Sequence, residues 1–206
     1  QGQPMTAPVD TVGVLLAGGL ARRMGGGDKP LRTLGGKPIL DHVVARARPQ
    51  VQDLLLNVNG DPARFAAYGL PTAVDVPLAG ILTGMEWARK THPGATWLAS
   101  FATDAPFFPP TLVRRLHQAV VDGKAEMACA QSGGRTHPVF ALWPVSLADD
   151  LRAAMTQEDM RKIDAWTARY RIVHVDFPTD PYDPFFNINK PENLAEAETL
   201  FAEAAQ

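Results

Sequence analysis

A glycine-rich segment near the start of the chain carries the clearest chemical signal. Residues 16–29 read Leu-Ala-Gly-Gly-Leu-Ala-Arg-Arg-Met-Gly-Gly-Gly-Asp-Lys, with five glycines and three cationic side chains. Glycine lets backbone N–H groups approach phosphate oxygens closely, while arginine and lysine supply the opposite charge. The composition predicts a phosphate-binding loop. A surface loop without a ligand has the same composition, so this second interpretation stays open.

Two common phosphate-binding motifs do not fit the chain. A P-loop has Ser or Thr directly after Gly-Lys, but Pro38 follows Gly36-Lys37 and Ala125 follows Gly123-Lys124. In the dinucleotide fingerprint, Pro30 would stand where the third glycine is required. The glycine-rich segment therefore indicates another class of phosphate-binding protein.

Polar residues follow several apolar runs farther along the chain. Asn57 and Asn59 follow one run, Asp75 another, and Thr103-Asp104 a third. Ligands of open α/β sheets bind beyond the carboxyl ends of the strands, so these positions are candidates for a site. A lone carboxylate after a buried strand is unfavourable unless it binds a cation or caps a helix. Asp104 is therefore either a metal ligand or a turn and cap residue, and Asn57 is either a ligand contact or a turn residue.

The elements that position these residues alternate between strands and helices. Apolar runs predict strands at residues 12–17, 54–58, 72–75, 96–102, 126–131, 139–143 and 171–177. Periodicity and capping chemistry predict helices at residues 39–47, 61–68, 79–90, 111–121, 147–155 and 160–170, and from 191 onward. This alternation predicts a Rossmann-like α/β fold with a mainly parallel sheet and helices on both faces. At 206 residues, a single domain is expected.

Composition excludes several classes of protein. The chain is 46% hydrophobic and 20% charged, as expected for a globular protein rather than a disordered one. A net charge of −2 argues against a nucleic-acid partner, although seven basic and three acidic side chains in residues 1–48 suit a small phosphate compound. Neither a membrane-spanning run nor a secretory leader is evident, which predicts a cytoplasmic protein. The single cysteine, Cys129, is expected to be a buried thiol in a reducing compartment.

Six sequence motifs together resemble those of the molybdenum cofactor guanylyltransferases, a branch of the nucleotidyltransferases. They are the loop Leu16 to Lys29, Asn57-x-Asn59, Pro77-Leu78-Ala79-Gly80, Thr103-Asp104-x-Pro106, Arg135-x-His137-Pro138 and Asn187-x-Asn189-x-Pro191-Glu192-x-Leu194. The motifs follow the order of the family and cover most of the chain. Two positions depart from the family pattern: only Val76 separates Asp75 from Pro77, and Lys190 stands where threonine is common.

The resemblance implies transfer of GMP from GTP to the terminal phosphate of molybdenum-molybdopterin, with release of pyrophosphate and with Mg²⁺ as the cofactor. Molybdoenzymes or their chaperones would receive the product. No Ser-His or Cys-His pair stands out in the sequence, so no protein nucleophile is expected. Two alternatives stay open: a cytidylyl- or sugar-1-phosphate nucleotidyltransferase, and a non-catalytic module that binds the nucleotide or delivers the cofactor.

The resemblance also implies roles for individual residues. The residues assigned to GTP are Leu16, Ala17, Gly18, Gly19, Lys29, Asn57, Asp75 and Asp104. Those assigned to molybdopterin are Arg135, His137, Asn187 and Asn189. Arg23, Lys29 and Asp104 are assigned to catalysis, with Asp104 as the Mg²⁺ ligand. Residues 1 to about 105 would form a nucleotide-binding half and residues 106–206 a molybdopterin-binding half. Structural alternatives stay open for Lys29 as a solvated lysine, His137 in a hairpin turn and Asn189 as a helix cap.

Overall fold

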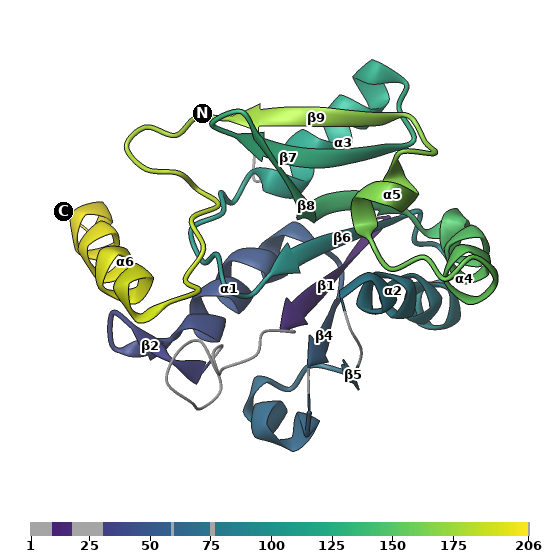
Figure 1. The fold of residues 1–206 in the computed structure, drawn as a ribbon. Helices are drawn as coiled ribbons and strands as arrows, with labels where there is room; N and C mark the ends of the chain where they lie inside the picture. Colours follow the sequence, from purple (N-terminus) through teal and green to yellow (C-terminus); the bar gives the residue numbers. More distant parts are fainter. Residues whose placement is uncertain (1–9, 18–30, 59, 75–76, 206) are drawn as a thin grey trace.

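The computed structural model describes residues 10–17, 31–58, 60–74 and 77–205. Its strands are β1 Thr11–Ala17, β2 Thr33–Leu34, β3 Lys37–Pro38, β4 Leu54–Val58, β5 Thr72–Val74, β6 Trp97–Ala102, β7 Met127–Ser132, β8 Arg135–Pro144 and β9 Ile172–Phe177. Seven of them form one sheet in the order β5-β4-β1-β6-β8-β7-β9, while β2 and β3 form a separate hairpin (Figure 1). The β2–β3 hairpin was not predicted from the sequence.

Most neighbouring strands of the main sheet are parallel. β5, β4, β1 and β6 are parallel to one another, and β7 is parallel to β9. Only β8 runs antiparallel to its neighbours β6 and β7. Its direction follows from the two-residue turn Gly133-Gly134, whose φ angles of +54° and +75° suit a tight hairpin. The predicted mainly parallel sheet is confirmed, and the structure joins β7 and β8 as a hairpin.

Helices cover both faces of the sheet (Figure 1). The α-helices are α1 Ile39–Ala47, α2 Pro77–Thr91, α3 Leu112–Gly123, α4 Ala148–Gln157, α5 Ile163–Thr167 and α6 Pro191–Ala204. Short 3₁₀ helices span Arg48–Gln50, Pro62–Tyr68 and Val145–Leu147. The second of these begins as predicted, since the Asp61 side chain accepts a hydrogen bond from the Ala63 amide and Pro62 is its first residue. None of the described helices is both long and apolar enough to cross a bilayer.

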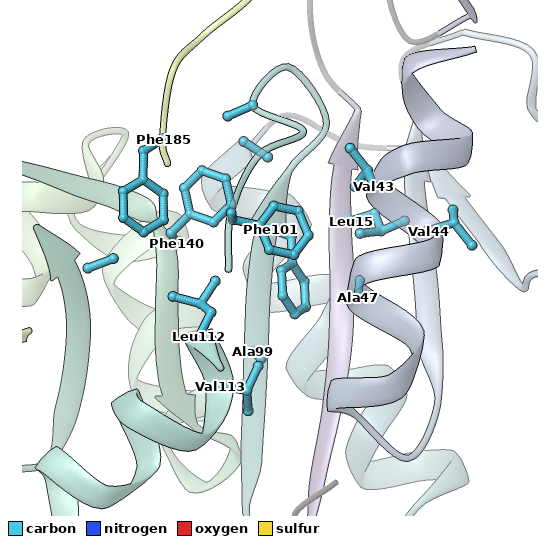
Figure 2. Close-up of a cluster of buried hydrophobic side chains, with 14 of the residues drawn as sticks. Leu15, Val43, Val44, Ala47, Ala99, Phe101, Leu112, Val113, Phe140 and Phe185 are labelled. Carbon is cyan, nitrogen blue, oxygen red and sulfur yellow. The ribbon is translucent and has the colours of Figure 1, made fainter. Parts of the chain in front are cut away.

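Two hydrophobic clusters flank the central strands. Every residue of β1 is buried, and its side chains alternate between the clusters. Leu15 packs in the cluster that includes residues of α1 and α3, and Val14 packs in the cluster that includes residues of α2 and α4. Figure 2 shows Leu15 facing Val43 and Val44 of α1. Burial on both faces explains why β1 is a continuous apolar run in the sequence.

One predicted helix is much shorter than expected. The sequence predicted a helix over residues 160–170, but α5 contains only Ile163–Thr167. Asp159 has a φ of +54° and Lys162 is extended, so the chain cannot be helical before Ile163. Met160, Ile163 and Trp166 still pack on the same hydrophobic cluster, and this produces the helix-like spacing.

Candidate active site

The carboxyl ends of three strands meet at one edge of the sheet. Leu16 of β1 pairs with Asn57 of β4 on one side and with Ala102 of β6 on the other. Beyond β6, the Thr103 hydroxyl donates a hydrogen bond to the Leu16 carbonyl oxygen over 3.4 Å. This bond ties the end of β1 to the turn that contains Asp104. The register therefore brings Leu16, Asn57 and Asp104 to the same edge, as the sequence predicted.

Asn57 is held against the first turn of α2. Its side chain is buried, with 1% of the residue surface exposed. A Cβ atom added to Gly80 would lie 2.5 Å from Asn57 Nδ2 and 2.9 Å from Leu16 Cδ2. Only glycine lets the helix approach this closely. Gly80, the last residue of the Pro77-Leu78-Ala79-Gly80 motif, therefore packs directly against Asn57 at the strand ends.

Asp104 is joined to a segment far away in the sequence. The Ile188 amide donates a hydrogen bond to the Asp104 carbonyl oxygen over 2.7 Å. Ile188 is fully buried, while Asp104 is partly exposed. Asn187 and Asn189 flank Ile188 and are therefore held beside the end of β6. The structure thus brings together residues that the sequence assigned to different substrates.

The structure does not support the alternative in which the Asn189 side chain caps α6. The Oδ1 atom of Asn193 accepts hydrogen bonds from the amides of Lys190 and Asn189, over 3.0 and 3.3 Å. The capping side chain is thus Asn193, three residues into the helix, and not Asn189. A polar residue at the third helical position often bonds back to the first amides in this way.

Arg135 and His137 lie at the same edge of the sheet as Asp104. β7 runs in the same direction as β6 because both are antiparallel to β8, so the β7–β8 turn lies at the carboxyl edge. Arg135 pairs with Ser132 at this turn and is exposed. His137 is partly buried, and its ring packs on Phe185 with 4.7 Å between the centroids. Burial lowers the pKa of the His137 imidazole, with the nearby Asp183 carboxylate acting in the opposite direction.

Two polar residues beside His137 were missed in the sequence analysis. The Ser132 hydroxyl lies 2.7 Å from His137 Nε2 and donates to Asp183 Oδ1 over 2.8 Å. The expectation that no Ser-His pair exists was therefore wrong. Asp183 lies beyond β9, and no local sequence pattern links it to the hairpin. A serine five residues before a histidine was the only available signal.

Several predicted site residues lie outside the described residues. They are Gly18, Gly19, Arg23, Lys29 and Asp75. Leu16 and Ala17, the last two residues of β1, are buried. The roles assigned to these residues stay predictions.

The described part of the site offers few metal ligands. Among the described residues, no group of three or more His, Cys, Asp or Glu side chains could hold a metal ion. Asp104 supplies one partly exposed carboxylate, and the segment from Asn187 to Asn189 beside it supplies amide groups. Mg²⁺ commonly takes one or two carboxylates from the protein and completes its shell with water and substrate phosphates. This donor set fits such an ion, and it does not fit a closed structural zinc site.

A separate hollow of about 980 Å³ lies on the outer side of α1. Its lining includes Lys37, Arg48, Tyr68 and Phe201. None of the described residues that were assigned to the site contributes to this lining. The hollow is therefore separate from the residues assigned to the candidate site.

Cys129 behaves as the sequence predicted. It is buried, and burial raises the pKa of its thiol to about 12. Only the thiolate is a strong nucleophile, so burial disfavours the reactive form of this side chain.

Comparisons with known proteins identify the family of the chain. Residues 13–172 match the model of the MobA-like NTP transferase domain. The molybdenum cofactor guanylyltransferase of Nitrobacter hamburgensis is 54% identical over 198 residues, covering 93% of this chain and 95% of that protein. The enzyme of the same name from Rhodopseudomonas palustris is 52% identical over 203 residues, covering 96% and 97%.

Solved structures show the same fold. Molybdopterin-guanine dinucleotide biosynthesis protein A from Archaeoglobus fulgidus matches with a TM-score of 0.71 and 24% identity, over 94% of this chain and 99% of that one. A Mycobacterium tuberculosis protein in complex with manganese matches with a TM-score of 0.65 and 15% identity, over 93% and 99%. The family match and the near full-length identity to curated relatives show that the chain belongs to the MobA-like NTP transferase family, as the sequence motifs implied.

Proposed function

We propose that the protein transfers GMP from GTP to the terminal phosphate of molybdenum-molybdopterin, forming the molybdopterin guanine dinucleotide cofactor and pyrophosphate. The observation that carries this proposal is the identity above 50% to molybdenum cofactor guanylyltransferases along nearly the whole chain. The convergence of Asn57, Asp104 and the Asn187–Asn189 segment at one strand-end edge supports it.

The reaction is an in-line displacement at the α-phosphorus of GTP. An oxygen of the molybdopterin phosphate forms a bond to this phosphorus, and the bond from the α-phosphorus to the oxygen that bridges it to the β-phosphorus breaks. Pyrophosphate leaves with that electron pair. Catalysis then consists of positioning the reactants and neutralising the phosphate charge, and no protein nucleophile takes part. Cys129 and Ser132 are both buried, which agrees with a mechanism that uses neither side chain as a nucleophile.

We assign the positioning to three groups of residues. Leu16, Ala17, Asn57, Asp75 and the loop with Gly18, Gly19, Arg23 and Lys29 hold GTP. Asp104 holds Mg²⁺, which offsets phosphate charge when it is bound. Arg135, His137, Asn187 and Asn189 serve the molybdopterin side. We place the reaction in the cytoplasm, because a free, buried cysteine suits a reducing compartment.

The decisive experiment measures pyrophosphate after the protein is incubated with molybdenum-molybdopterin, Mg²⁺ and each of the four NTPs in turn. We expect release with GTP alone. Release with CTP but not GTP would instead identify a cytidylyltransferase. GTP binding without pyrophosphate release from any NTP would indicate a non-catalytic module.

Asp104→Ala tests the metal assignment in the same assay. We expect turnover to fall by at least about 100-fold with an unchanged circular dichroism spectrum, because the ion loses its carboxylate ligand beside the phosphates. Asp122→Ala is the matched control, since Asp122 is an exposed carboxylate near the end of α3. Turnover close to wild type in Asp104→Ala would remove this residue from the site.

A further inference from the structure

The Ser132 hydroxyl connects two elements that border the candidate site. It lies 2.7 Å from His137 Nε2, within the β7–β8 hairpin, and 2.8 Å from Asp183 Oδ1, in the segment between β9 and α6. Ser132 is buried, with 1% of its surface exposed. A buried hydroxyl that bridges a histidine and a carboxylate links the hairpin to this segment.

The chemistry of the three groups fixes the direction of the hydrogen bonds. An ionised carboxylate only accepts, and a serine hydroxyl has one hydrogen to donate. Ser132 therefore donates to Asp183, and the His137 Nε2–H donates to the Ser132 oxygen. The carboxylate that accepts the Ser132 hydrogen bond is far too weak a base to remove the proton, and His137 Nε2 is here a donor, so Ser132 is not an activated nucleophile. The histidine acts here as a donor that holds the serine in place.

Asp183 also forms hydrogen bonds with residues that follow it in its own segment. Its Oδ1 atom also accepts from the Phe185 amide over 2.9 Å, and its carbonyl oxygen accepts from the Phe186 amide over 3.2 Å. The turn seats the Phe185 ring, which is 2% exposed, on His137 and Phe140, at centroid distances of 4.7 and 4.9 Å. Both the polar and the aromatic contacts thus bind this turn to the β7–β8 hairpin.

The same segment reaches Asp104 three residues after Phe185. Ile188 donates its amide hydrogen to the Asp104 carbonyl oxygen. Residues 178–190 contain no helix or strand, so their position depends on such individual contacts. The Asp183 turn holds the middle of the segment, the Ile188 bond lies near its end, and Asn193 of α6 binds the amides of Asn189 and Lys190 where the helix begins.

We propose that Ser132, His137 and Asp183 form a positioning unit that sets Asn187 and Asn189 against Asp104. The inference rests on the proposed function, because the distance it controls is that between the metal ligand and the molybdopterin side of the site. It assigns His137 an indirect role, through Ser132, while the exposed Arg135 keeps direct access to the substrate. A small displacement of such a segment from the reactive geometry lowers the rate steeply.

The test compares variants of Ser132, which accepts from His137, and of Asp183, which accepts from Ser132. We expect Ser132→Ala and Asp183→Ala to lower kcat/KM for molybdenum-molybdopterin by about 10- to 100-fold, with the GTP Kd within about twofold of wild type. Asp183→Asn keeps an acceptor oxygen at Oδ1 and is expected to restore most of kcat/KM. Rescue by this variant distinguishes hydrogen bonding from charge.

Ser100→Ala is the matched control. Ser100 is also 1% exposed, its hydroxyl donates to the Val139 carbonyl oxygen over 2.7 Å, and it accepts from Trp143 Nε1 over 2.9 Å. Its loss should lower Tm to a similar extent without changing kcat/KM for molybdenum-molybdopterin. An equal fall in kcat/KM in both serine variants would mean that general destabilisation, rather than positioning, explains the effect.

Amide hydrogen exchange at Ile188 separates this inference from the proposed function, since it needs no substrate. We expect the Ile188 amide to exchange at least about tenfold faster in Ser132→Ala than in Ser100→Ala. Unchanged exchange, or faster exchange with unaltered kcat/KM, would overturn the positioning role. A wild-type protein that transfers no nucleotide to molybdopterin would overturn the proposed function and leave the exchange result to decide the structural claim.

Discussion

The Gly80 backbone lies so close to the Asn57 side chain that position 80 has no room for a Cβ atom. The 2.5 Å that would separate such an atom from Asn57 Nδ2 is shorter than van der Waals packing permits. Either the amide or the first turn of α2 must therefore move when any side chain is added. Since Asn57 is assigned to the nucleotide, this movement should change GTP binding.

We predict that Gly80→Ala raises the GTP Kd by about tenfold, which corresponds to about 1.4 kcal/mol. Gly84→Ala is the control one turn later in α2, where a Cβ would lie 2.9 Å from Leu98 Cδ2. It should lower Tm but leave the GTP Kd within about twofold. Isothermal titration of both variants checks the prediction, and equal Kd values would show that Asn57 does not contact the nucleotide.

Lysine placement gives a second prediction. Lys29→Ala should weaken GTP binding and turnover by at least about tenfold more than Lys124→Ala, because only Lys29 belongs to the glycine-rich loop. Lys124 ends α3 in a left-handed conformation and leads into the amino end of β7, at the edge of the sheet opposite Asp104. Equal effects on the GTP Kd would mean that net charge, and not position, drives binding.

The fold could be predicted from the sequence because its signals are local. The apolar runs that form β1 and β6 are buried on both faces, and the glycine pair at 133–134 specifies a tight turn. The order of these elements then determines which strand ends meet, so Asn57 and Asp104 could be assigned to one edge. The predicted boundaries of α5 were wrong because an apolar spacing of three to four residues gives no information about the non-helical backbone conformations of Asp159 and Lys162.

The contacts that complete the site are long-range and left no pattern in the sequence. Ser132 meets Asp183, and Asp104 meets Ile188, only after β7, β9 and the following segment have packed. Side-chain partners separated by tens of residues are fixed by tertiary structure, so motifs alone supplied the residues without their contacts.

The single cysteine provides a direct test of burial. Burial raises the pKa of the Cys129 thiol to about 12, so the thiol stays protonated at pH 8. We expect Ellman's reagent at pH 8 to label none of the folded protein within minutes, and one thiol per chain in guanidinium chloride. Fast labelling without denaturant would show that Cys129 is accessible and that the packing between β7 and β8 is looser than described.

His137 should make stability dependent on pH. Burial lowers its pKa in the folded protein below the value of about 6.5 expected in the unfolded chain. Between these two pKa values the unfolded chain binds more protons, so the free energy of unfolding falls as the pH falls below about 7. At neutral pH His137 is neutral in both the folded and the unfolded chain, so none of this stability is lost there.

His137→Gln keeps an N–H donor for Ser132 and removes the titrating group. Urea unfolding at pH 5, 6 and 7 should therefore give a smaller loss of stability toward low pH in this variant than in wild type. Parallel curves for the two proteins would mean that His137 does not contribute to the pH dependence.

The strand order suggests how the two substrates are divided. Asp104 follows β6, which lies between β1 and β4 on one side and β8 on the other. Apart from Asp104, the residues assigned to GTP lie in or come after β1, β4 and β5 in the sequence, while Arg135 and His137 belong to β8. An in-line displacement needs the acceptor phosphate opposite the leaving pyrophosphate, so the acceptor should approach Asp104 from the β8 side.

Arg135→Ala tests this division of the chain at about residue 105. Because Arg135 is exposed at the β8 end of the edge, we predict that its loss weakens molybdopterin binding by about tenfold and leaves the GTP Kd within about twofold. Arg171→Ala, an exposed arginine that precedes β9 at the opposite edge, is the control and should change neither affinity. If Arg135→Ala weakens GTP binding and leaves molybdopterin binding unchanged, the two substrates occupy the opposite halves from those assigned, and the acceptor approaches from the β4 side.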